Sequence, residues 1–502
     1  MNFVVPNLDQ DFYAAASPTI LLCVTSLVAL LMSVSKKQSS PKIINAFNIS
    51  AIFVVFFLAI RNFVLGGKGS QVFLSGGYIE GRFGDFAQAL MLFVALVISL
   101  LMSASYIKEK FNRGEIIAIF HMVLAGMLAM VSTDDLVTMF IGLEIASLGT
   151  YALVGYTHPT KLSQEAAIKY FVLGAIAAAI LIFGFGLIYA SAGSLRISEI
   201  GPAITKIGRN SWLELGVVLT LVGIGFKMAL VPFHMWTPDA YEGAPTGFTA
   251  FMATAMKVMI MIAAIRLIEF GLDGVQSVWL SAVGFMAAAS LLFANIMALA
   301  QQSVKRLLAY SSIAHSGYMA LALASMSGTS HTHQVPSILF YLVSYVFVSL
   351  GAFAIIMWLE NERCDNIIVD DLSGLAKNHP WAASAMAVFM FSLGGMPPTV
   401  GFISKLYIFN AAINNNLIFL VVIAAIGSTI SLYYYMRIIV KMFMTDVNPA
   451  LGGIIKPVRS PVTTIVVAIS VALIMLFGTA EPESLMRLVK LSAAEISDGS
   501  EG

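Results

Sequence analysis

Long apolar runs recur along the whole chain, and they restrict its possible folds more than any other feature. A helix needs about 20 mostly apolar residues to cross the hydrocarbon core of a membrane, and about fourteen runs meet that length. They lie at 18–35, 44–65, 86–107, 115–132, 135–156, 164–191, 213–235, 244–270, 277–300, 307–327, 336–359, 383–412, 417–441 and 461–479. The runs lack the alternation of barrel strands, and lipid cannot satisfy open backbone groups. We therefore predict an all-α polytopic membrane protein.

The composition supports a chain that has lipid as its solvent. Soluble domains are about 45–50% apolar and about 25% charged, whereas this chain is 59% hydrophobic and 11% charged. Its net charge is +1 and it contains no basic tract, so we expect no nucleic-acid partner. The sequence has no CxxC, GxGxxG or GxxxxGK[ST] motif, so we expect no cofactor and no metal bound by this chain.

An even number of spans places both termini on one side of the membrane. With the N-terminus outside, the inner loops collect about fifteen Lys and Arg, against about nine in the outer loops. Loops 62–82 and 196–209 run against this trend. We predict that both termini are periplasmic, and that the tail after Glu481 is a short polar extension.

Proline interrupts two of the predicted spans, the seventh at Pro232 and the twelfth at Pro397 and Pro398. Proline removes a backbone donor and frees a carbonyl, and such a break is tolerated at membrane depth only where protein or water satisfies the backbone. A single break is equally consistent with a packing kink. Two breaks five spans apart favour an internal repeat, and because five is odd the second copy enters the membrane from the opposite face.

The repeat divides the chain into four parts. We predict an N-terminal three-helix segment (1–114), a first five-helix repeat (115–270), a second, inverted five-helix repeat (277–445), and a last transmembrane helix with the tail (446–502). Each repeat contains one proline-broken helix. In transporters with inverted repeats, the functional site lies at the interrupted helices.

Ionisable side chains occur within the predicted spans, where they are costly and are functional candidates by default. Glu144 lies ten residues beyond Asp134, or about 15 Å into a core about 30 Å thick. Counting from the starts of their predicted helices in the same way places Lys227, Lys257 and His315 deep in the membrane core, and Lys405 follows the second break at similar depth. These groups share a depth on different helices, so they favour a row for proton passage parallel to the membrane plane.

Each of these residues also has a purely structural explanation. Glu144 and Lys227 can be a static ion pair, or a pair that forms and breaks and so switches the proton affinity of Lys227. His315 can be a hydrogen-bonded core residue, and His234, beside the first break, can simply anchor a helix end. We expect the carbonyls freed near Met228 and Gly394 to hold water molecules along the path.

The motifs around these residues resemble the antiporter-like membrane subunits of NADH-quinone oxidoreductase (respiratory complex I), and most of all subunit N. The resemblance covers nearly the whole chain. It rests on GLEIASLGTYALVGY, GIGFKMALVPFHMWTPDAYEGAPTGFTAFMATAMK, KRLLAYSSIAHSGYM, GGMPPTVGFISKLYIF and ISLYYYMRIIVKMF. A sister subunit commonly has glutamate where Lys405 stands, and another adds a lateral helix after the fourteenth span.

The resemblance implies roles for four residues. Glu144 and Lys227 would form the coupling pair, Lys257 would relay protons, and Lys405 would communicate with the outer face. It also implies a cell inner membrane location, neighbouring antiporter-like subunits, and partner subunits that hold FMN, iron-sulfur clusters and the quinone site. The expected function is proton export coupled to electron transfer from NADH to quinone, such as ubiquinone.

Two other functions remain open at this point. The chain can be a subunit of a multi-subunit sodium/proton antiporter, which resembles the same fold and needs no redox partner. It can also be a membrane scaffold whose buried charges only hold helices together.

Overall fold

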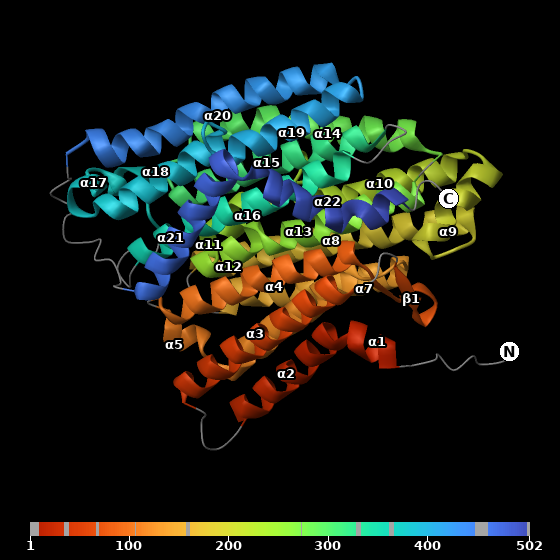
Figure 1. The fold of residues 1–502 in the computed structure, drawn as a ribbon, viewed down its shortest axis with the longest axis horizontal. Helices are drawn as coiled ribbons and strands as arrows, with labels where there is room; N and C mark the ends of the chain where they lie inside the picture. Colours follow the sequence, from red (N-terminus) through yellow and green to blue (C-terminus); the bar gives the residue numbers. More distant parts are fainter. Residues whose placement is uncertain are drawn as a thin grey trace.

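The chain is described here from a computed structural model. The structure describes residues 10–34, 40–66, 70–105, 107–156, 161–272, 274–327, 333–360, 366–446 and 460–498. The helices run side by side in one bundle, and their long axes share a common direction across the view in Figure 1. The predicted all-α membrane fold is confirmed.

Within the described residues, thirteen helices are long and apolar enough to cross a membrane. They are α2 (Ser17–Val34), α3 (Pro41–Leu65), α4 (Arg82–Ser103), α6 (Gly114–Val131), α7 (Leu136–Tyr156), α8 (Lys161–Ala192), α10 (Ser211–Met228), α12 with α13 (Thr246–Ala253 and Ala255–Arg266), α14 (Gln276–Leu299), α15 (Val304–Ala324), α16 (Gln334–Leu359), α20 (Ile418–Met444) and α21 (Pro461–Met475). Three of them continue in short irregular turns: α13 in η2 (Leu267–Gly271), α15 in η3 (Ser325–Ser327) and α21 in η5 (Leu476–Ala480).

The predicted twelfth span is not one continuous helix. It consists of α18 (Pro380–Gly394) and α19 (Val400–Asn414), each of 15 residues. A 15-residue helix is about 22 Å long, which is shorter than the hydrocarbon core. The proline pair separates the two halves, so α18 and α19 are needed together to cross the membrane.

Shorter elements connect the spans. They are α1 (Gln10–Ala15), α5 (Lys108–Phe111), α9 (Ile197–Ile207), α11 (Trp236–Gly243), α17 (Leu375–Asn378), η1 (Leu74–Gly76), η4 (Val369–Leu372), and the antiparallel strands β1 (Gln71–Phe73) and β2 (Tyr78–Glu80), which pair with Gln71 opposite Glu80.

The tail after Glu481 is not the polar extension that we predicted. It forms a helix, α22 (Pro482–Asp498), whose Leu485 and Val489 are buried, and it packs against α4 and α16. Its apolar residues recur at helical spacing, and our prediction, which considered only the length and polarity of the tail, did not take this spacing into account.

Several helix starts follow from local sequence. The Ser303 side chain accepts a hydrogen bond from the Arg306 backbone at the start of α15, and Asn210 caps α10 in the same way. Ser40 and Ser460 cap helices whose first residue is proline. Such caps satisfy donors that the first turn leaves open, and proline at the first position loses no bond.

The two proline breaks have the same local construction. Helix α10 ends in a turn with Ala229 in the left-handed conformation (φ 61°), and α18 ends with Gly395 at φ 77°. In both turns, two backbone N–H groups bond back into the last helical turn, a motif that commonly ends helices. Figure 1 shows α10 leading to α11 and α18 leading to α19 in opposite directions. This arrangement agrees with the inversion expected of the second copy.

The centre of the bundle is formed by three spans. The segments Thr246–Gly271 and Val304–Ser327 are buried along their whole apolar windows, and Gln334–Leu359 almost so. In contrast, only 28% of the residues in the apolar windows of α2, α20 and α21 are buried. A helix that is apolar all round and buried belongs to the core of a bundle. The polar groups on the central helices are therefore shielded from lipid.

Candidate functional site

Lys227 lies at the end of α10, just before the first break, and its side chain is buried among aromatic rings. Its Nζ donates to the hydroxyl of Tyr170 (3.3 Å) and lies 5.3 Å from the ring centres of both Tyr170 and Tyr151. These ring faces favour a cation. Glu144 lines the same cavity, which has a volume of about 10 Å³. Among the described residues, Glu144 and Lys227 form no direct ion pair within 4 Å.

Ser316 connects the first break to Lys257. The carbonyl of Met228, which the break frees from the helix, accepts a hydrogen bond from the Ser316 hydroxyl (2.5 Å). Nζ of Lys257 donates to the same hydroxyl (2.7 Å) and to the carbonyl of Ser312. The freed carbonyl, where we expected water, is thus satisfied by a side chain of α15. This chain of bonds links Lys257 to the residue that follows Lys227.

The helix that carries Lys257 is itself irregular. Thr254 separates α12 from α13 with φ −115° and ψ −78°, one turn before Lys257. The Thr254 hydroxyl bonds to the carbonyl of Ala250 (2.6 Å). A threonine hydroxyl that bonds back into the preceding turn often bends a helix. We did not predict this kink, although the threonine is visible in the sequence.

His315 lies in a group of tyrosines beyond Lys257. Its Nδ1 is 2.6 Å from the hydroxyl of Tyr341, and its Nε2 is 3.4 Å from the hydroxyl of Tyr435. The Tyr345 ring lies 5.0 Å away, and the Tyr345 hydroxyl donates to Ser312 (3.0 Å). His315 is therefore hydrogen bonded on both ring nitrogens, and its neighbours reach the residue whose carbonyl binds Lys257.

Lys405 is held at the second break. Its Nζ donates to the carbonyls of Leu393 (3.2 Å) and Gly394 (3.0 Å) and to the hydroxyl of Ser428 (3.0 Å). It also lies 4.8 Å from the ring centre of Tyr318. The carbonyls freed by the proline pair thus bind the lysine that follows them. A Cβ at Gly395 would lie 2.8 Å from Cδ of Lys405, so glycine is needed there for space as well as for φ.

A small cavity joins the last two groups. It has a volume of about 10 Å³ and is lined by His315, Tyr341, Tyr345 and Lys405. From one end to the other, the buried groups form a row that passes from Lys227 through Lys257 and His315 to Lys405. We call these four residues, with Glu144 beside Lys227, the central row.

His234 does not join the central row. Its ring packs against Phe293 at 5.0 Å, and its Nδ1 has no hydrogen-bond partner among the described residues. The prolines Pro232, Pro397 and Pro398 lie at the breaks as predicted, and the Val231–Pro232 and Pro397–Pro398 bonds are cis. The three prolines therefore mark the two helix breaks, and His234 lies outside the central row.

Sequence reasoning missed the hydroxyl groups between the charges. Tyr341 and Tyr345 are spaced by four residues on α16, and Ser312 and Ser316 are spaced by four on α15. This spacing places each pair on one helix face, and it was available as a signal. Polar residues at helical spacing within a buried span are expected to face other protein groups rather than lipid.

Comparison with known proteins places this geometry in a family. The family described as "NADH:quinone oxidoreductase/Mrp antiporter, TM" matches residues 133–431. The chain is 38% identical over 430 residues to NADH-quinone oxidoreductase subunit N of Trichlorobacter lovleyi, covering 85% of this chain and 86% of the relative.

Solved structures give the same fold. A chain of respiratory complex I from Thermus thermophilus with bound aureothin is 30% identical, with a TM-score of 0.79 over 93% of this chain and 98% of that one. A chain of the Mrp complex from a Dietzia species has a TM-score of 0.83 over 97% and 98%, but only 19% identity, so it shows the fold alone. The sequence identities, the coverage and the matching fold together show that the chain belongs to the family of NADH-quinone oxidoreductase subunit N.

Proposed function

We propose that the central row is the route by which this chain, a proton-translocating membrane subunit of NADH-quinone oxidoreductase, moves protons. One observation carries the proposal. The freed carbonyl next to Lys227, the Ser316 hydroxyl and the Lys257 ammonium lie in one chain of hydrogen bonds. Beyond Lys257, His315 and its hydrogen-bonded tyrosine continue this series of polar groups as far as the cavity that Lys405 lines.

In this proposal protons come from the cytoplasm, pause on Lys227 and Lys257, and leave by way of Lys405. Both chain termini are then periplasmic, and the membrane is the cell inner membrane. Glu144, which shares a cavity with Lys227, changes the proton affinity of that lysine as its own distance or charge changes. Electron transfer from NADH to quinone takes place on FMN and iron-sulfur clusters in partner subunits, and it reaches this chain as an electrostatic change.

The first experiment purifies the tagged chain in mild detergent and asks what accompanies it. We expect flavin, iron and NADH-driven quinone reduction with stoichiometric redox subunits. The alternative is a multi-subunit sodium/proton antiporter, because the description of the matching family also includes the Mrp antiporter. Copurification with membrane subunits alone, together with sodium-dependent proton flux in vesicles free of NADH and quinone, would support the antiporter instead.

The Lys227→Ala variant tests the route itself. We expect NADH-driven proton pumping in vesicles to fall by at least about tenfold, because the variant removes a group that holds the proton in transit. The amount of assembled complex, measured on native gels, should stay unchanged. Normal pumping by the assembled variant would exclude Lys227 from the route and would favour the scaffold reading of the buried charges.

A further inference from the structure

A buried ion pair lies away from the central row, at one membrane face. Lys305 is at the start of α15 and Glu360 directly follows α16, and both side chains are at most 5% exposed. Nζ of Lys305 lies 3.4 Å from Oε1 of Glu360 and donates to the carbonyl of Ala244 (3.3 Å). The Thr246 hydroxyl also donates to Glu360. The pair is thus fixed by α11, α12, α15 and α16 together.

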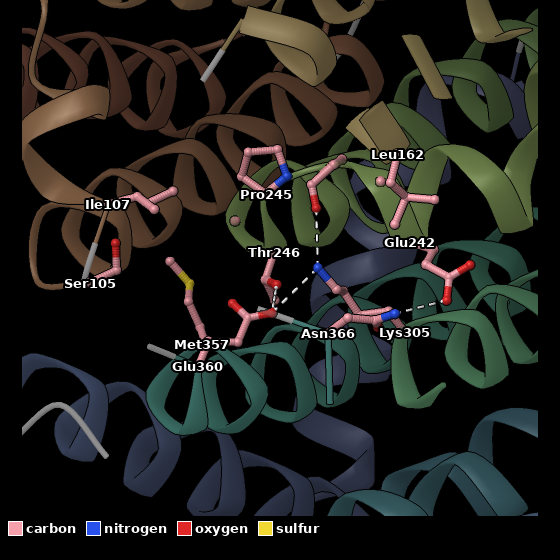
Figure 2. A pocket seen from close by; sticks show the side chains of 13 residues that line it. Ser105, Ile107, Leu162, Glu242, Pro245, Thr246, Lys305, Met357, Glu360 and Asn366 are labelled. Carbon is pink, nitrogen blue, oxygen red and sulfur yellow. Dashed lines mark hydrogen bonds and ion pairs between the residues drawn. The ribbon is translucent and has the colours of Figure 1, made fainter. Parts of the chain in front are cut away.

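The pair lines a cavity of about 30 Å³ (Figure 2). A cavity needs roughly 10–15 Å³ of such volume, and two to four polar partners, to hold a water molecule. Other polar groups in its wall come from Ser105, Glu242 and Asn366. The cavity therefore has room for water and the groups to bind it.

The position of the cavity is fixed by the ends of the helices that form it. Thr246 begins α12, Lys305 lies in the first turn of α15, and Glu360 follows the last residue of α16. All three ends lie at the same membrane face, which the proposed topology makes cytoplasmic. Glu242 is the other acidic group among the described residues of the wall, and it is bonded to Arg306 (3.0 Å) and Asn366 (3.1 Å).

Polar groups lead from this cavity towards Lys257. Ser312, whose carbonyl binds Lys257, lies seven residues beyond Lys305 on α15, or about 10 Å along the helix. The Tyr241 hydroxyl lies 3.4 Å from the Ser312 hydroxyl. The Thr249 hydroxyl donates to the carbonyl of Tyr241 (2.9 Å) and lies 3.5 Å from the carbonyl of Ala244, to which Lys305 donates. Hydroxyls and carbonyls therefore occupy the space between the two lysines.

We propose that Lys305 and Glu360 form the proton uptake site of the central row, a role that rests on the proposed function. A hydronium ion gives its proton to the Glu360 carboxylate, which leaves water and a carboxylic acid and releases Lys305 from its partner. The proton then passes through waters and hydroxyls to the neutral amine of Lys257, and the carboxylate of Glu360 returns to Lys305. The net transfer takes one proton from hydronium to Lys257.

The charges around the cavity favour a proton over a metal cation. The Lys305 ammonium lies 3.4 Å from the Glu360 carboxylate in the wall of the same cavity, so a sodium ion bound to Glu360 there would meet a like charge at close range. A proton avoids this repulsion, because it neutralises the carboxylate instead of adding a separate cation. The uptake site is therefore expected to respond to pH and not to sodium.

A static ion pair is the competing explanation, and a set of variants separates the two. Glu360→Gln removes the proton acceptor, Glu360→Asp keeps it, and the double variant Lys305→Met with Glu360→Met replaces the pair by apolar groups. Such replacement of a buried pair often preserves or improves stability. Asp370→Asn is the matched control, since it removes one negative charge from an exposed pair with Lys441 at the same face. All variants are studied in the assembled complex, by native gels and NADH-driven proton pumping.

If the site takes up protons, Glu360→Gln slows pumping by about fivefold or more near pH 8.5 and by less than about twofold near pH 6.5, because protons are scarce at alkaline pH. Glu360→Asp recovers at least half of the rate, and the double Met variant assembles but stays slow. Asp370→Asn pumps normally. Normal pumping by Glu360→Gln at both pH values overturns the proposal, as does a loss that the double Met variant repairs.

A Lys257→Met variant in the same series separates this proposal from the proposed function. If Lys257→Met stops pumping while the Glu360 and double Met variants pump normally, the central row stands and only the uptake site fails. If Lys257→Met pumps normally, the central row itself fails.

Discussion

At the scale of single residues, the Ser316 hydroxyl joins the broken helix to a buried lysine. It donates to the carbonyl of Met228 and accepts from Nζ of Lys257. A buried acceptor that loses its donor costs roughly 1–3 kcal/mol, and each 1.4 kcal/mol is a factor of ten in an equilibrium. One hydroxyl therefore affects both the geometry of the break and the position of the Lys257 ammonium.

We expect Ser316→Ala to lower the rate of NADH-driven proton pumping by about tenfold while the complex still assembles. The measurement compares initial rates of vesicle acidification at equal amounts of complex. Ser325→Ala on the same span is the control, because that hydroxyl bonds to the carbonyl of Ala322 within its own turn. Equal rates for both variants would mean that Ser316 only fills space.

At the scale of elements, charged side chains hold α11, the segment after the first break, against its neighbours. Asp239 on α11 accepts from Lys169 of α8 (2.9 Å) and from Arg306 of α15 (2.7 Å), and Glu242 also binds Arg306. Burial alone would raise the pKa of Asp239, but the hydrogen bonds from Lys169 and Arg306 outweigh it and hold the pKa below its usual value. These ion pairs are partly exposed, so each contributes little by itself.

We expect Asp239→Asn to lower the thermal midpoint of the complex at pH 7 by about 1–2 °C. A carboxylate whose folded pKa is depressed stabilises the fold above its unfolded pKa, and this contribution is lost as the pH falls through the folded pKa. The difference between wild type and variant should therefore shrink below about pH 4. Asp446→Asn, in an exposed pair with Lys377, is the control. A difference that persists unchanged at pH 3.5 would assign the effect to packing rather than to charge.

At the scale of the whole molecule, the central row spans both predicted copies of the repeat. Lys227 lies on α10 just before the first proline break, and Lys405 lies on α19 after the second. Lys257 and His315 lie between them on the buried central helices. A proton that travels the row must pass every group in turn, so the groups act in series.

Because groups that act as a unit have non-additive effects, we expect the double variant Lys227→Ala with Lys405→Ala to pump no more slowly than the slower single variant, within about twofold. Pumping rates of both single variants and the double variant in vesicles test this. A double variant whose loss equals the product of the two single losses would indicate two independent routes instead of one row.

Some features of this protein follow from the sequence by itself. Span length, helix content and the two breaks are set by apolar runs of sufficient length and by proline, whose missing N–H acts locally. The motifs around Lys227, Lys257 and Lys405 likewise pointed to the family before any contact was known. These features depend only on residues that are close together in the chain.

Only the tertiary structure decided which groups meet. The bonds from Ser316 to Met228, from Lys257 to Ser312 and from Lys305 to Glu360 join residues 55 to 88 positions apart, on helices that the sequence does not pair. Likewise, α22 was predicted as a polar tail because its apolar stripe has meaning only against α4 and α16. Packing between helices depends on the shape of the whole bundle. It therefore decided which of the residues identified in the sequence came together in the central row and in the cavity.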